Sequence, residues 1–184
     1  MIEIRPWMKR EFSFDQPIDV FPALLERLRG TPARAKELIA SVSEEVLTRR
    51  SHGKWSVKDH LGHLVDLQPL DEQRLHEFLA RTATLSAADI SNRATEQGNH
   101  RQTPCAHILG RLRIGREELA RKLDALTKEE IGISAVHPRL QKPMRLMDWV
   151  YFVAEHDDHH LAKARRAILC GERQWSGDRE EGSQ

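Results

Sequence analysis

The sequence shows its longest helical pattern in Trp149-Val-Tyr-Phe-Val-Ala-Glu-His156-Asp-Asp-His159-His160-Leu-Ala-Lys-Ala-Arg-Arg-Ala-Ile168. Apolar residues recur at steps of three and four, which predicts a long amphipathic helix buried along one stripe: Leu146, Trp149, Val150, Val153, Ala164, Ala167 and Ile168. His156 and His160 lie on the same stripe. Because residues four apart on a helix are neighbours on one face, these two imidazoles can present nitrogens to a single metal ion.

This pair of histidines has two interpretations. The four-residue spacing permits a shared metal ion. A histidine on an apolar face is also commonly a core residue with one satisfied hydrogen bond, and the chain has ten histidines, so two can share a face by coincidence. The helix alone leaves both interpretations open, and a metal site needs a third ligand from elsewhere in the chain.

Length and composition bound the class of protein. The 184 residues fit one domain, 1–184, with a core expected over about 18–170 between a mobile N-terminal arm and a mobile C-terminal tail. Charged residues make up 31% of the chain but the formal net charge is only +1, so neither a nucleic acid nor a membrane partner is predicted.

Cysteines and apolar runs bear on the compartment. Cys105 and Cys170 form no Cys-x-x-Cys pair, which favours a reducing compartment and offers no thiolate metal site. The start of the chain is interrupted by charge too often for a signal peptide, and no apolar run approaches the roughly 20 residues that span a bilayer. We therefore expect a cytoplasmic location.

Glycine and proline set several expected helix boundaries. A first helix is expected from about 17–19 to Gly30, and a second begins at once at Thr31-Pro32, where a capping residue precedes a proline. Another helix begins after Thr103-Pro104, and the last one ends at Gly171. No strand-like alternation of useful length is present.

The helix that begins at Ser56 carries the third candidate histidine. Asp59 follows the cap by three residues, and His63 lies within the apolar series of this helix. Pro69 predicts a bend or a break, because proline removes a backbone amide donor. The polar segment 82–102 that follows is long enough for either a functional lid or a disordered loop.

The helix after Pro104 also carries many charges. We expect them to form its solvated face rather than a binding patch: Arg111, Arg113, Arg116, Glu117, Glu118, Arg121 and Lys122.

Four long helical segments with lengthy connections predict an all-α four-helix bundle, in which sites are built from side chains on facing helices. His63 is then the natural partner of His156 and His160, because it too occupies a core-facing position. A three-residue step also lies nearly on one face, so His60 could replace His63, and His159 could replace His160. Apolar neighbours flank His63 more symmetrically, which favours His63.

The motifs around these residues resemble the DinB/YfiT-like superfamily, and within it the small DinB-like domain proteins. The resemblance covers about Ile18 to Ile168. It rests on these pieces of sequence: Trp55-Ser-Val-x-x-x-x-Gly-His63-Leu-x-Asp66, Arg74-Leu75, His137-Pro138, Met144-Arg-Leu-x-Asp148-Trp and His156-Asp-x-x-His160-Leu.

The resemblance implies an up-and-down bundle with unusual connectivity and a divalent metal ion held by His63, His156 and His160. It also implies dimerisation through bundle faces. Members with assigned activities include transferases that use bacillithiol or mycothiol and an isomerase that uses mycothiol, and others are described as metal-dependent hydrolases. The resemblance therefore implies a small-molecule substrate and, for the transferase type, a low-molecular-weight thiol.

Three neutral imidazoles leave an ion its full double charge and an open coordination position. Such an ion can activate bound water or stabilise a bound thiolate. Imidazole ligands suit zinc, nickel, iron or copper, and zinc or nickel is preferred here. We expect a thiol S-transferase type of enzyme; the alternatives are a hydrolase at the same site and a non-catalytic bundle that the ion staples together.

Acidic residues near the histidines have two roles open to them. Asp66, Asp157 and Asp158 could each accept the distal ring N–H of a ligating histidine and fix its tautomer. They could equally be surface carboxylates that pair with Lys163 or Arg165. Glu155 is a candidate general base with the same alternative, and His159 is expected at the edge of the site or on the surface.

Overall fold

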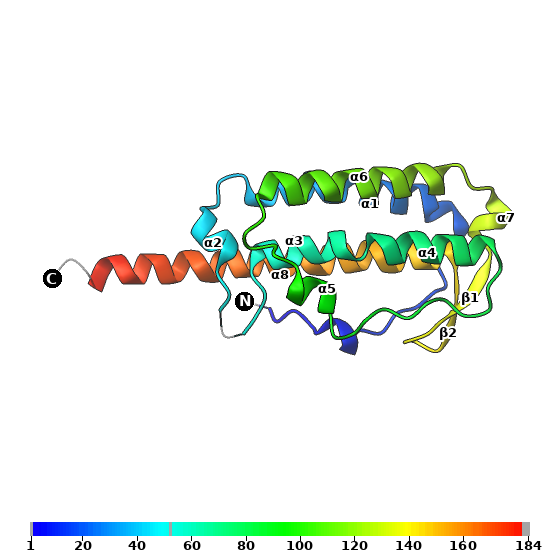
Figure 1. Cartoon of the computed structure of the whole chain (residues 1–184). Helices are drawn as coiled ribbons and strands as arrows, with labels where there is room; N and C mark the ends of the chain where they lie inside the picture. Colours follow the sequence, from blue (N-terminus) through cyan, green and yellow to red (C-terminus); the bar gives the residue numbers. More distant parts are fainter. Residues whose placement is uncertain (1, 52, 182–184) are drawn as a thin grey trace.

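Four long helical segments pack side by side in the computed structural model, which describes residues 2–51 and 53–181 and side chains as far as Gly171 (Figure 1). They are α1 (Phe21–Ile39), α3 followed by α4 (Val57–Asp66 and Gln68–Leu79), α6 (Cys105–Asp124) and α8 (Leu146–Glu181). Both α1 and α3 pack against α6 and α8. The predicted all-α four-helix bundle is therefore confirmed. Within the described residues, none of the helices has an apolar stretch long enough to cross a bilayer.

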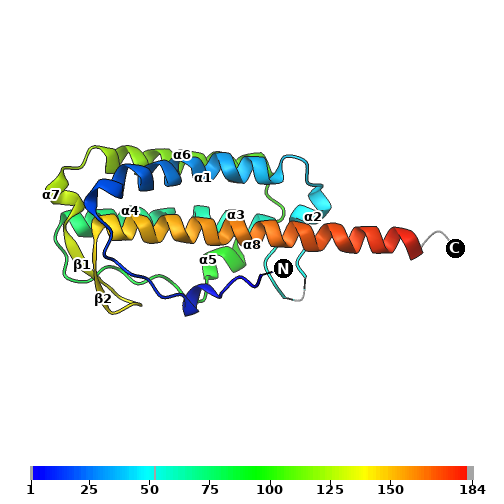
Figure 2. The ribbon, with the colours of Figure 1, turned by 180° about the vertical axis from the view of Figure 1, so that it is seen from behind.

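The connection between α4 and α6 sets the direction of the helices. It returns along the bundle and contains α5 (Arg93–Gln97), so that α6 starts at the same end as α3 (Figures 1 and 2). Side-chain contacts agree: Lys58 Nζ donates to the carbonyl of Thr103 at 2.9 Å, and Gln68 Nε2 donates farther along to that of Leu112 at 3.3 Å. The helices thus alternate in direction at every step except from α4 to α6.

Short elements close the ends of the bundle. They are the 3-10 helix η2 (Ile18–Val20), the helices α2 (Glu44–Thr48) and α7 (Lys128–Ile131), and an antiparallel hairpin of β1 (Ser134–His137) and β2 (Lys142–Arg145). A further 3-10 helix, η1 (Trp7–Lys9), lies in the N-terminal arm. The expectation that the chain has no strands is wrong for this hairpin. Strands of four residues are too short to produce a recognisable alternation in the sequence.

Two predicted helix boundaries are also wrong. Helix α1 runs through Pro32 without a second start, because Leu28 and Ala35 on either side of it are both fully buried and packing holds the helix together. Helix α8 continues past Gly171 to Glu181. A Cβ at Gly171 would lie 3.0 Å from Cγ1 of Val46, so this glycine permits close packing of α2 rather than ending the helix.

Other predicted boundaries are confirmed. The Ser56 hydroxyl accepts from the backbone N–H of Asp59 at 3.1 Å, and the Asp59 carboxylate accepts from that of Ser56 at 2.9 Å, which completes a capping box. The helix breaks just before Pro69, where α3 ends and α4 begins. The helix expected after Pro104 begins at Cys105.

Two apolar clusters fill the bundle, one toward each end, with a polar layer between them. On α8 the first cluster ends at Ala154 and the second begins at Leu161. Burying polar groups costs free energy unless they find partners, so a polar layer in mid-bundle marks a functional region rather than a stabilising one. Its members include His63, Asp71, Arg116, His156, Asp157 and His160.

The N-terminal arm packs beside α8 (Figure 2). Phe12 is buried, and the ring of Trp7 lies 5.1 Å from that of Phe12 and 5.0 Å from that of Phe152 on α8. This contact places Trp7 over the polar layer.

Candidate metal centre

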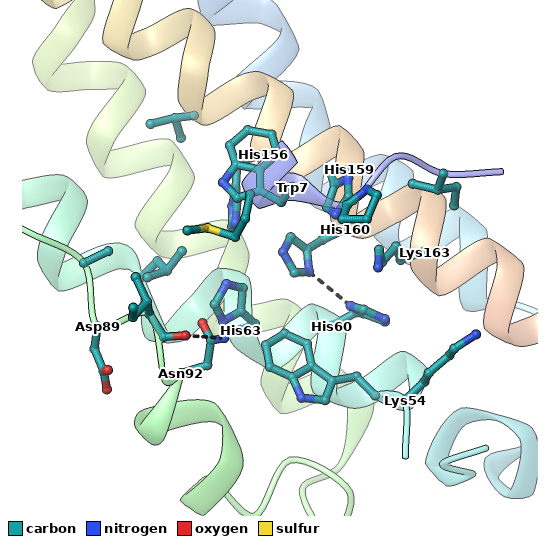
Figure 3. A pocket seen from close by; sticks show the side chains of 18 of the residues that line it. Trp7, Lys54, His60, His63, Asp89, Asn92, His156, His159, His160 and Lys163 are labelled. Atoms are coloured by element: carbon teal, nitrogen blue, oxygen red, sulfur yellow. Dashed lines mark hydrogen bonds between the residues drawn. The ribbon is translucent and has the colours of Figure 1, made fainter. Parts of the chain in front are cut away.

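Three histidines from two helices meet in the polar layer. His63 projects from α3, and His156 and His160 project from successive turns of α8, with one nitrogen of each lying within 4.8 Å of the others (Figure 3). The ring centroids are 4.6 Å apart for His63 and His160, and 4.5 Å apart for His156 and His160. The side chains favoured by the sequence thus converge on one point.

Burial keeps these imidazoles neutral. It lowers the pKa of His63 to about 4, although Asp66 opposes the shift. The pKa values of His156 and His160 lie well below the usual value, because burial and the neighbouring histidines disfavour a charge there. Metal ions bind neutral imidazole, and three such donors within reach of one point suit a divalent transition metal. The residues therefore fit the kind of ion that the sequence predicts.

A hydrogen-bond relay fixes the tautomer of His63. The Thr95 hydroxyl donates its only proton to the Asp66 carboxylate at 2.9 Å, so it must accept from Nδ1–H of His63, which lies at 2.9 Å. His100 Nε2 lies 2.8 Å from the same carboxylate oxygen, and its hydrogen bond, with that of Thr95, lowers the pKa of Asp66 despite burial. The lone pair of His63 is therefore on Nε2. Asp66 acts on the ring through Thr95 rather than directly.

The two alternative histidines lie beside the cluster. His60 Nδ1 is 3.1 Å from Nδ1 of His160, so one of these rings donates to the other. His159 is buried rather than on the surface, and its ring lies 5.5 Å from that of Trp7. Both line the same cavity as the cluster.

Arg116 is buried in the same layer, so its expected place on the solvated face is wrong. Its guanidinium donates to Asp157 at 2.9 and 2.7 Å and to Asp71 at 2.8 Å. Burial acts to lower the pKa of Arg116, but the two carboxylates outweigh it and raise the pKa above its usual value. The sequence does not distinguish Arg116 from the seven other charged residues on its helix, because burial here depends on two carboxylates from other helices.

Glu155 and Asp158, also on α8, pair with arginines. Glu155 accepts from Arg10 and from Arg27, the latter at 2.7 Å, and these arginines lower its pKa although burial opposes them. Asp158 accepts from Arg27 and Arg34. These ion pairs replace both roles expected for Asp157 and Asp158. Among the described side chains, neither carboxylate is hydrogen-bonded to a ring of the histidine cluster, and neither pairs with Lys163 or Arg165. Glu155 is accordingly held as a structural carboxylate.

A cavity of about 1370 Å³ opens onto the three histidines. The Trp7 ring lies 4.8 Å from that of His156 (Figure 3). The Trp55 ring lies 4.9 Å from that of His63. Ligand pockets are usually about 300–1,000 Å³, so this cavity has room for more than one small molecule.

Sequence reasoning missed Trp7, Thr95 and His100 at this site. A signal for His100 was present in Gly62, a glycine inside a helix, where it costs about 1 kcal/mol relative to alanine. A Cβ at Gly62 would lie only 2.2 Å from the His100 ring, so the glycine is there to admit that ring beside His63. The segment 82–102 therefore contributes to the site through Thr95 and His100.

An all-α bundle with buried histidines converging from facing helices is the class of protein that this fold and site define. The chain belongs to the DinB superfamily, whose sequence profile matches residues 27–164. The solved structure of YfiT from Bacillus subtilis, described as a probable metal-dependent hydrolase with an unusual four-helix bundle topology, is similar with a TM-score of 0.75. That similarity covers 91% of this chain and 94% of YfiT at 17% identity, and it shows a shared fold. No curated protein sequence matches this chain.

Proposed function

We propose that this protein is a metal-dependent enzyme of the thiol S-transferase type, in which His63, His156 and His160 hold a zinc or nickel ion. The observation that carries the proposal is the convergence of three neutral imidazoles, from two helices, on the wall of a large cavity. When bound, a divalent ion with three neutral ligands lowers the pKa of a coordinated thiol or water and keeps a coordination position open.

The chain's own groups prepare the donors. Thr95 and Asp66 keep the proton of His63 on Nδ1, which leaves Nε2 as the donor atom. His60 can do the same for His160, by accepting from its Nδ1–H at 3.1 Å. Trp7 and Trp55 place apolar rings against the cluster, which shields part of it from water and strengthens electrostatic interactions there.

Two observations favour thiol transfer over hydrolysis. The cavity has room for both a thiol and an electrophile. The carboxylates on α8 near the histidines are held by arginines, so none of Glu155, Asp157 and Asp158 is placed as a general base for water. A thiol needs less help, because its unperturbed pKa of about 8.5 is far closer to neutrality than that of water.

Hydrolysis at the same site is the second candidate, and the description of YfiT as a probable metal-dependent hydrolase supports it. The third is a bundle stapled by the ion without turnover. Tag-free protein loaded with zinc or nickel should be assayed with a thiol plus an aryl halide and, separately, with activated esters. We expect thiol-dependent transfer by the wild-type protein. His63→Ala should abolish this activity, and His159→Ala should leave it intact.

Ester cleavage without any need for thiol would replace the transferase by the hydrolase. Neither activity, combined with a large loss of thermal stability on chelation, would support the stapled bundle.

A further inference from the structure

The cavity has a second polar region, away from the three histidines, at the tip of the β1–β2 hairpin. His137 is the last residue of β1, Arg139 lies in the turn that follows, and both line the cavity. Nε2 of His137 and Nη2 of Arg139 are buried and have no hydrogen-bond partner among the described residues. Unpaired buried donors are costly, so two of them on neighbouring residues that line one cavity call for an acceptor.

The hydrogen bonding of His137 shows that its unpaired atom is a donor. The backbone N–H of Leu140 donates to Nδ1 of His137 at 3.3 Å. Burial, together with Arg74 and Arg139, lowers the pKa of His137 to about 4, so the ring is neutral. Its single proton is therefore on Nε2, which is the atom without a partner. Arg139 Nη2 is a donor in every state.

The charges around these donors favour an anion. Among the residues that the structure describes, Arg139 has aromatic neighbours and no ion pair with a carboxylate: its Cζ lies 5.6 Å from the ring centroid of Phe152 and 5.9 Å from that of Trp7. Arg74 adds a second buried cation, whose hydrogen bonds within the described part of the chain go to the carbonyl of Ser86. Asp71 also lines the cavity, but Arg116 already engages it.

We propose that Arg139 and His137 form a carboxylate-binding subsite, which holds the acidic end of a small molecule whose reacting group reaches the three histidines. This proposal rests on the proposed function, which determines what that reacting group is. Trp7 connects the two regions, because its ring contacts the Arg139 guanidinium at 5.9 Å and the His156 ring at 4.8 Å. The substrate is thus an organic acid with an apolar body that passes along Trp7 and Phe152.

Binding of hexanoate and of hexanamide tests the subsite, since the two probes have nearly the same size and shape and differ in charge. Both are titrated calorimetrically into the full-length protein, with tryptophan fluorescence as a second readout. We expect wild type to prefer hexanoate, and Arg139→Gln to weaken hexanoate binding roughly 10- to 100-fold without changing hexanamide binding. Arg139→Lys should lie between them, because it keeps the charge but loses the planar fork.

Lys54→Gln is the matched control. It removes one positive charge from an exposed residue that lines the same cavity, and it should leave the preference for hexanoate intact. Equal binding of the two probes to wild type, or unchanged hexanoate binding in Arg139→Gln, would overturn the subsite and leave water as the acceptor. If Arg139→Gln does not fold, the comparison of hexanoate with hexanamide in wild type and in Arg139→Lys still tests the subsite.

Metal content separates this proposal from the proposed function. His63→Ala should lose the ion and keep the preference for hexanoate, whereas Arg139→Gln should keep the ion and lose the preference. A preference that disappears in His63→Ala would mean that hexanoate binds the ion, which overturns the subsite. The transfer assay is then repeated with mercaptohexanoate and with mercaptohexanol as the thiol. If Arg139→Gln raises the KM for mercaptohexanoate and not that for mercaptohexanol, the acid belongs to the thiol; if it raises neither, the acid belongs to the electrophile.

Discussion

Replacing Thr95 by valine tests the relay that orients His63. Valine has nearly the same shape as threonine, and Thr95 is 1% exposed, so the change removes the hydroxyl and little else. Two hydrogen bonds of 2.9 Å are lost, and Nδ1–H of His63 is left buried without an acceptor. An unsatisfied buried donor costs about 1–3 kcal/mol. Removing an outer hydrogen-bond partner of a ligating histidine typically lowers metal affinity about 10- to 100-fold.

The two magnitudes belong to different measurements: the first is a loss of stability in the metal-free protein, and the second is a loss of metal affinity of about 1.4–2.8 kcal/mol, since 1.4 kcal/mol corresponds to a factor of ten. The assay is a competition titration of zinc or nickel against a chelating indicator, with urea unfolding of the metal-free protein beside it. Thr95→Ser should retain most of the affinity, and Thr82→Val is the control at an exposed threonine. Metal binding by Thr95→Val that equals that of wild type would refute the relay as the support of His63.

Two further predictions concern the polar layer. Arg116→Met should destabilise the fold by about 3–5 kcal/mol in urea unfolding, because it leaves Asp71 and Asp157 as buried unpaired carboxylates. Adding Asp71→Asn and Asp157→Asn should recover much of that loss. A loss near zero for Arg116→Met alone would contradict the buried network. In metal-free protein the free energy of unfolding should fall as the pH drops from about 6.5 toward 4. The pKa of His63 is about 4 in the folded chain, so only the unfolded chain takes up its proton in that window, and a flat profile would contradict this.

Periodicity and capping signals predicted the bundle well, because they are local. The capping box at Ser56 and the break before Pro69 follow from side chains within a few residues of each other. The helix boundaries predicted at Pro32 and Gly171 are wrong for the opposite reason. Packing against other helices lets α1 and α8 continue through residues that usually end helices. The direction of α6 depends on a long connection that has no local signature.

Much of the histidine cluster was predictable: helical spacing and core-facing positions favoured His63 with the pair on the last helix, and the family resemblance implied His63, His156 and His160 rather than His60 or His159. Their supports were not, because Thr95 and the buried partners of Arg116 come from segments far away in the chain. The role of the three histidines as ligands, like the predicted dimer and cytoplasmic location, stays a prediction.

Metal content measured on tag-free protein by elemental analysis tests the central claim most directly. We predict close to one equivalent of zinc or nickel per chain in wild type and in His159→Ala, and almost none in His63→Ala, His156→Ala or His160→Ala. Equal metal content in all five proteins, or no bound metal in wild type after incubation with either ion, would contradict the account.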